Sequence, residues 1–163
     1  MAENSTEKYI QPFISVTQNV FRDFCQSTVT PGRVYFVEKD EFQKSWDISG
    51  IIGLTGEAKG AVAISLRTDT ALKITEILTN EKHEGLDSDV TDATGEIINI
   101  IAGNVKKELE EAFRIVISLP TIVKGAAHSI VWPSEKTRII CIPFDIFDDQ
   151  EICLSIAIDP TKQ

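Results

Sequence analysis

The sequence has few of the residues that carry most protein chemistry. Its three cysteines, Cys25, Cys141 and Cys153, are odd in number and include no C-x-x-C spacing. This pattern argues against a disulfide framework or a zinc site and favours buried, reduced thiols. The two histidines, His83 and His128, stand far apart and in no metal-ligand or catalytic-triad spacing, so we interpret both as surface residues.

Long apolar runs and an excess of positive charge are also missing. No apolar segment approaches the roughly 20 residues that a membrane-spanning helix needs, and the N-terminal segment MAENSTEKY has no apolar signal-peptide core. We therefore expect a cytoplasmic protein. The formal net charge of −9 argues against nucleic-acid binding, which depends on Lys and Arg to neutralise phosphates, and against anionic membranes.

The composition is that of a globular domain, with 42% hydrophobic and 25% charged residues among 163. It predicts a single domain over residues 1–163, with residues 1–8 disordered. Strand-like segments occur in runs with antiparallel turns, and helical segments form separate blocks. This order predicts an α+β fold, a mainly antiparallel sheet with helices packed on one face. The expected helices before the longest one are 12–24 and 68–78; the expected strands are 33–37, 48–54, 61–66, 114–119, 138–144 and 152–158.

Four shorter features complete these expectations. Thr30–Gly32 is predicted to be a turn, and Thr68 or Asp69 is predicted to cap the helix at 68–78. Residues 121–131 are predicted to be extended. The acidic loop Asp145–Gln150 lacks an EF-hand spacing, which favours a solvated loop over a cation site.

The longest helical pattern spans Leu86–Phe113. Asp87 or Ser88 is the expected N-cap, because its side-chain oxygen can accept a hydrogen bond from the first turn. Apolar or small residues recur at i, i+3 and i+4 and form one face. These residues are Val90, Ala93, Thr94, Ile97, Ile98, Ile101, Val105, Leu109 and Ala112.

The opposite face of this helix is unusual. It carries Asp92, Glu96, Asn99, Gly103, Lys106 and Glu110, with Gly95 at its edge. Glu96 and Asn99 are i, i+3 neighbours, so their side chains project side by side. A glycine inside a helix costs about 1 kcal/mol relative to alanine, and close packing is a weak explanation on a polar face. The small residues leave a bare strip suited to docking another surface; the alternative is an ordinary solvated face, with Gly103 against a packed neighbour.

The sequence of this helix resembles a known signature motif. Asp92-x-x-x-Glu96-x-x-Asn99, continuing into Ile100-Ile101-Ala102-Gly103-Asn104, is similar to the motif of the CheC/CheX/FliY phosphatases of bacterial chemotaxis. Pro120 and the amphipathic start Tyr9–Phe13 add minor support. The chain carries one copy of the motif, which resembles CheX, whose members form homodimers through strand contacts.

The resemblance implies a phosphatase acting on the aspartyl phosphate of a phosphorylated CheY-type receiver domain. Asn99 would orient the attacking water, and Glu96 would pair with the receiver's active-site Lys. Asp92, Gly95, Gly103 and Lys106 are the candidate partner-binding residues. The chain would need no cofactor of its own, because the receiver would supply Mg²⁺. A homodimer is expected, and the alternative is a non-catalytic adaptor or flagellar-switch module of the same fold.

Overall fold

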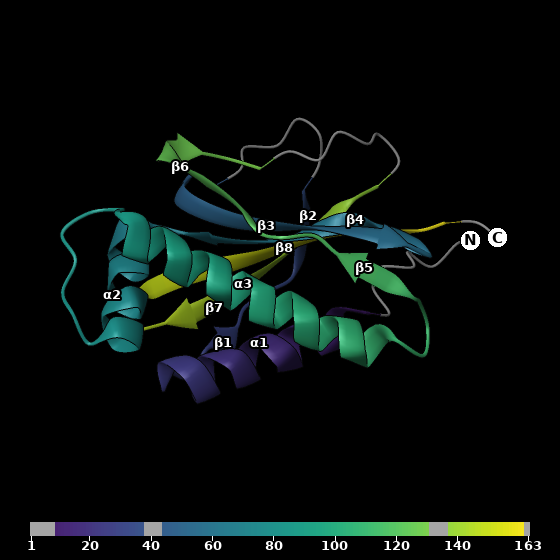
Figure 1. The fold of residues 1–163 in the computed structure, drawn as a ribbon, viewed down its shortest axis with the longest axis horizontal. Coiled ribbons are helices and arrows are strands. Elements are labelled where there is room, and N and C mark those ends of the chain that lie inside the picture. Colours follow the sequence, from purple (N-terminus) through teal and green to yellow (C-terminus); the bar gives the residue numbers. More distant parts are fainter. Residues whose placement is uncertain (1–8, 38–43, 131–136, 162–163) are drawn as a thin grey trace.

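The computed structural model describes residues 9–37, 44–130 and 137–161. Within them the strands pair in antiparallel fashion, and the helices lie on one side of the sheet (Figure 1), so the predicted α+β fold is confirmed. The helices are α1 (Ile10–Cys25), α2 (Thr68–Thr79) and α3 (Ser88–Leu109). The strands are β1 (Thr30–Pro31), β2 (Tyr35–Val37), β3 (Trp46–Gly56), β4 (Ala58–Leu66), β5 (Ile115–Ile117), β6 (Thr121–His128), β7 (Ile139–Ile146) and β8 (Gln150–Pro160).

The sheet has the order β1-β7-β8-β4-β3-β5. Each edge of the sheet is shared by two strands, because β2 also pairs with β7 and β6 also pairs with β3. Figure 1 shows α1 and α3 running along one face, with α2 at one end. As a result, the connection from β5 to β6 lies at the sheet edge beside α3. None of the helices in the described residues is long and apolar enough to cross a bilayer.

The main core lies between the sheet and the helices. Alternate residues of each central strand face the helices, as the period of two requires, and the apolar side of α3 meets them. The largest fully buried side chains are Phe13, Phe21, Phe144, Ile48, Ile52, Ile64, Leu66, Ile74, Ile97, Ile98, Ile101 and Ile140. On the other face Trp46, Cys141 and Cys153 form a smaller cluster. All three cysteines are free and buried, as predicted.

Side-chain oxygens fix where α2 and α3 begin. Asp87 is the N-cap of α3, and its Oδ1 accepts a hydrogen bond from the backbone N–H of the third helical residue at 3.0 Å. The prediction for α2 was wrong, because neither Thr68 nor Asp69 caps it. The cap position is Arg67, and Asp47 on β3 accepts from the Thr68 N–H at 2.8 Å and from its hydroxyl at 2.9 Å. A residue far away in the sequence therefore supplies the cap.

The predicted helix Leu86–Phe113 is too long at its C-terminal end. α3 ends at Leu109, and the next three residues turn. The turn brings the Phe113 ring against Tyr9 in an edge-to-face contact with 5.0 Å between ring centroids. Ala112, predicted to lie on the apolar face, is exposed in that turn.

The predicted turn Thr30–Gly32 is also wrong, since Thr30 and Pro31 form an edge strand beside β7. Proline lacks a backbone N–H, so it fits the edge of a sheet better than the centre. Gly32 donates its N–H to the Pro143 carbonyl at 2.8 Å and extends this pairing. The predicted disorder of residues 1–8 lies outside the described residues.

Candidate active site on helix α3

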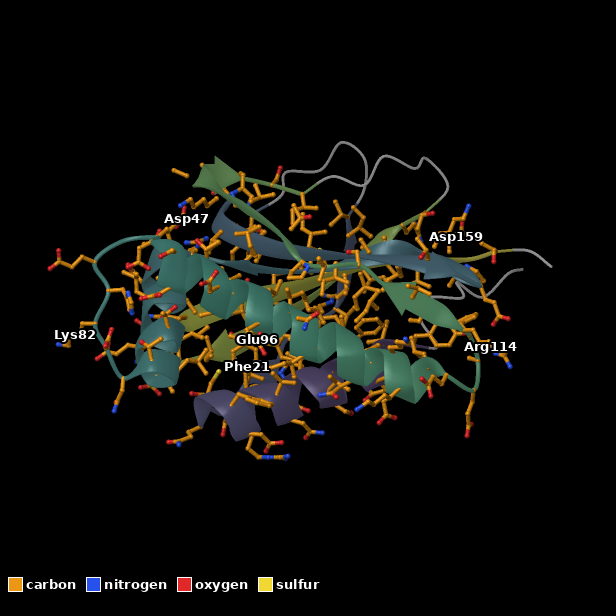
Figure 2. The ribbon with its side chains drawn as sticks, in the orientation of Figure 1. Phe21, Asp47, Lys82, Glu96, Arg114 and Asp159 are labelled. Atoms are coloured by element: carbon orange, nitrogen blue, oxygen red, sulfur yellow. The ribbon has the colours of Figure 1, made fainter. Side chains whose placement is uncertain are left out.

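Glu96 and Asn99 are adjacent exposed residues on α3, at the i, i+3 spacing predicted from the sequence. Figure 2 labels Glu96 midway along the helix. The next residue on the buried side, Ile97, is only 1% exposed and holds the helix on the core. Neither the Glu96 nor the Asn99 side chain makes a hydrogen bond or ion pair with another residue of the described ranges. Their polar groups are therefore available to a partner.

A hollow of about 410 Å³ lies between α3 and the connection from β5 to β6. One wall comes from the polar side of α3, and the other comes from three apolar residues of the connection and β6. The lining residues are Thr91, Asp92, Gly95, Glu96, Asn99, Leu119, Pro120 and Ile122. The helix pattern alone did not indicate the apolar wall, because it is contributed by a segment about twenty residues further along the chain.

The two glycines of the predicted strip have different surroundings. Gly95 is buried, and a Cβ there would lie 3.5 Å from Ile122 Cδ1 and 3.6 Å from Pro120 Cγ. These are ordinary van der Waals distances, so a methyl group would fit there and packing does not require a glycine. Gly95, predicted at the edge of the polar face, is nevertheless covered by the β5–β6 connection. A Cβ on Gly103 would meet no atom within 4 Å. Packing does not explain that glycine, and the strip of backbone at Gly103 is bare, as predicted.

The remaining strip residues differ in how close they lie to the hollow. Asp92 is exposed and lines it, one turn before Glu96. Gly103 and Lys106 follow Asn99 on the same side of the helix but do not line the hollow, and Lys106 is half-buried. The structure thus gathers Asp92, Glu96 and Asn99 around one cavity and leaves the other two residues beyond it.

The two histidines, predicted as surface residues, are partly exposed, and both make side-chain hydrogen bonds. The His83 side chain is only 5% exposed, and its Nδ1 donates to Asp87 Oδ2 at 2.8 Å. This hydrogen bond raises the pKa of His83 and lowers the pKa of Asp87. Ligand atoms of Glu81, His83 and Asp89 also lie within 4.8 Å of one another, which the sequence spacing did not indicate. This group stands about 10 Å along the helix from Glu96 and does not line the hollow.

His128 is half-buried and ties two strands together. Its Nδ1 donates to the Gly125 carbonyl at 2.8 Å, which leaves Nε2 to accept from the Ser49 hydroxyl at 2.8 Å. A serine–histidine pair of this kind can be catalytic, but Ser49 has no exposed surface and also bonds Ser65 at 2.8 Å. The pair therefore serves to hold β6 on β3.

Comparison with known structures places this fold in one class. CheX from Vibrio vulnificus has a TM-score of 0.84 and 29% sequence identity, covering 93% of this chain and 99% of that one. The CheX-CheY-BeF3-Mg²⁺ complex from Borrelia burgdorferi contains a chain with a TM-score of 0.77 and 26% identity, covering 92% of this chain and 97% of that one. The fold is that of a CheC-like protein.

Sequence comparison gives the family. CheY-P phosphatase CheX of Thermotoga maritima is 28% identical over 110 residues, which span 66% of this chain and 69% of that protein. The family model described as "Chemotaxis phosphatase CheX" matches residues 48–145, a range that contains the whole of α3. The chain belongs to the CheX family of chemotaxis phosphatases, and the resemblance inferred from the motif is confirmed.

Proposed function

We propose that this protein hydrolyses the aspartyl phosphate of a phosphorylated CheY-type receiver domain. The observation that carries the proposal is the exposed, unbonded pair Glu96 and Asn99 on the core helix of a CheX-family chain. The Thermotoga maritima relative is a CheY-P phosphatase, and the Borrelia burgdorferi relative forms a complex with CheY, BeF3 and Mg²⁺. Both support a phosphorylated receiver as the substrate.

Asn99 would position the attacking water. A carboxamide is neither a nucleophile nor a base at neutral pH, but its carbonyl accepts a hydrogen bond and its NH₂ group donates two. It can therefore hold a water at a fixed angle in line with phosphorus. Phosphoryl transfer depends mainly on such positioning and on charge stabilisation, and an aspartyl phosphate is already activated. The free carboxamide of Asn99 meets this requirement without any further group on this chain.

Glu96 would hold the receiver in register. Its carboxylate stands one turn before Asn99 and forms no ion pair with a described residue. A Lys in the receiver's active site would donate a charge-assisted hydrogen bond to it, which is stronger than a bond between neutral groups. Because Glu96 and Asn99 share one helix face, fixing the first also fixes the distance of the second from the phosphoryl group.

The partner surface would extend along the same side of α3. Asp92 lines the hollow before Glu96, and the backbone of Gly95 forms part of its floor. Gly103 and Lys106 continue the surface beyond Asn99, where the absence of a side chain on Gly103 would let the receiver approach the helix closely. We propose all four as receiver contacts.

The chain would bind no cofactor of its own. Mg²⁺ is present with CheY in the Borrelia burgdorferi complex, so we propose that the receiver supplies both Mg²⁺ and the Lys. The hollow is lined by only two carboxylates, Asp92 and Glu96, and both are assigned to receiver contacts. This chain would then contribute only the Glu96 carboxylate and the Asn99 carboxamide to the reaction.

We also propose a homodimer formed through β6. One edge of this strand pairs with β3, and its other edge pairs with no strand of the described ranges. Exposed edges present free N–H and C=O groups that can pair with a second chain. Light scattering at micromolar concentration should give twice the chain mass of 18.1 kDa; the monomer mass would count against the dimer.

We further propose that residues 1–163 act as one domain in the cytoplasm.

A receiver panel tests the phosphatase directly. Phosphate release from several phosphorylated CheY-type receivers is followed with Mg²⁺, with and without this protein. We expect faster release from at least one receiver. Binding without acceleration would favour the alternative, an adaptor or flagellar-switch module of the same fold.

Glu96 variants sharpen the same experiment. Glu96→Ala should weaken receiver binding and catalysis together, because the charge-assisted contact is lost. Glu96→Lys should be worse, since two like charges would then face each other. Position 96 is exposed, so neither variant should change the melting temperature. An unchanged melting temperature is the control for folding.

A further inference from the structure

Leu119 is the most exposed of the large hydrophobic residues in the described ranges, with 85% of its surface accessible. A single exposed leucine is common on proteins and means little by itself. Its position gives it meaning, because Leu119 lines the same hollow as Glu96 and Asn99.

The chain around Leu119 is held in place. The Ser118 N–H donates to the Gly53 carbonyl at 2.9 Å, and the Gly53 N–H donates to Ser118 Oγ at 2.8 Å. The Ser118 hydroxyl in turn donates to the Leu119 carbonyl at 2.9 Å. Pro120 follows directly and restricts the backbone further. Leu119 is thus presented on a fixed support, and little backbone entropy remains to be lost when a partner covers it.

The segment from Ser118 to Ile122 also packs against α3. Gly95 is buried under Pro120 and Ile122, at distances that leave room for little more than a methyl group. This contact sets the apolar wall directly opposite the wall that carries Glu96. The hollow therefore joins two chemistries: a carboxylate and a carboxamide on one side, and an exposed leucine with its apolar neighbours on the other.

We infer that Leu119 is the apolar anchor by which this chain docks the phosphorylated receiver. The inference rests on the proposed function. A receiver that brings its phosphoryl group to Asn99 must cover the hollow, and its surface beside the phosphorylated Asp then meets Leu119. The partner surface that fits is apolar where it contacts Leu119 and cationic where it contacts Glu96. Polar contacts fix the phosphoryl group, and Leu119 provides contact area next to them.

The test compares two exposed apolar residues on opposite faces of the sheet. Val116 on β5 is 62% exposed, and it alternates with Ile115 and Ile117, which pack on the helix-side core. Val116 therefore points to the other face. Leu119→Asp and Val116→Asp make a matched pair: each puts a carboxylate at an exposed apolar position, and neither should disturb the fold.

Steady-state phosphate release from a phosphorylated CheY-type receiver is measured for wild type and both variants. Leu119→Asp should raise KM for the receiver by about ten- to hundredfold, the loss expected for one leucine buried in the complex. The kcat at saturating receiver should stay near the wild-type value, because the reacting groups are untouched. Val116→Asp should match wild type in both constants, and Leu119→Ala should give a smaller rise in KM.

Three results would overturn the inference. An unchanged KM for Leu119→Asp in an active wild-type background removes the anchor but leaves the phosphatase intact. A changed oligomeric state with an unchanged KM, seen by light scattering, would assign Leu119 to a contact between two copies of this chain. If wild type does not accelerate release, receiver binding is measured instead, and equal affinity of wild type and Leu119→Asp refutes the anchor separately from catalysis.

Discussion

Gly103 links stability and docking in one substitution. It lies inside α3, and a Cβ added there would meet no atom within 4 Å. Gly103→Ala therefore creates no clash and removes the helix penalty of glycine, about 0.8–1 kcal/mol. For a chain of this size, that gain raises the melting temperature by roughly 2–4 °C. Thermal unfolding with a denaturant titration measures the gain.

The same methyl group should weaken receiver docking. If the receiver contacts the bare backbone at Gly103, Gly103→Ala holds it away and raises KM, and Gly103→Leu raises it further. Gly85→Ala is the control, because a Cβ at Gly85 also meets nothing within 4 Å but lies in the connection before α3. A more stable Gly103→Ala with unchanged kcat and KM would refute the docking role. A less stable one would refute the helix-penalty calculation.

Three further predictions concern the support of the site. Gly60→Ala should cost about 3 kcal/mol or more and reduce soluble expression, because its Cβ would fall on the Ala157 carbonyl oxygen of β8. Asp47→Ala should cost about 1 kcal/mol by removing the cap of α2. The hydrogen bonds from Thr68 hold the pKa of Asp47 below its ordinary value, so wild type should lose this contribution in denaturant titrations as pH falls through the lowered pKa, and the variant should not. NMR titration should place the pKa of His83 above its ordinary value of 6.5, chiefly because His83 donates a hydrogen bond to Asp87. Asp87→Asn should lower the pKa of His83, and an unshifted value in wild type would contradict the hydrogen bond. The hydrogen-bonded pair of His83 and Asp87 stabilises the folded chain below the ordinary pKa of histidine, and this stabilisation is lost as pH rises through the raised pKa of His83.

Local sequence was sufficient for the helix that bears the site. The apolar spacing of α3 identified its buried face, and Asp87 marked its start, because both depend on residues within a turn of one another. The exposure of Glu96 and Asn99 followed from the same pattern. The C-terminal end of α3 could not be predicted from this pattern, because it depends on the contact of Phe113 with the distant Tyr9 ring.

Long-range contacts explain the other errors. The cap of α2 comes from Asp47 on β3, and no pattern near Thr68 could indicate it. Gly95 looked like part of a polar strip, because the segment that buries it, at Pro120 and Ile122, is placed by the sheet. The apolar wall of the hollow was missed for the same reason. Single-sequence patterns describe each face of a helix but not the strand that approaches it.

Asn99→Ala tests whether this carboxamide positions the attacking water. Phosphate release from a phosphorylated CheY-type receiver and receiver binding are measured for wild type and variant, with Mg²⁺ present. We expect the acceleration to fall by about 100-fold or more while binding changes much less, since the lost contact matters mainly in the transition state. The exposed position of Asn99 should leave the melting temperature unchanged. Equal rates for wild type and Asn99→Ala, with both bound to the receiver, would contradict the catalytic role of Asn99.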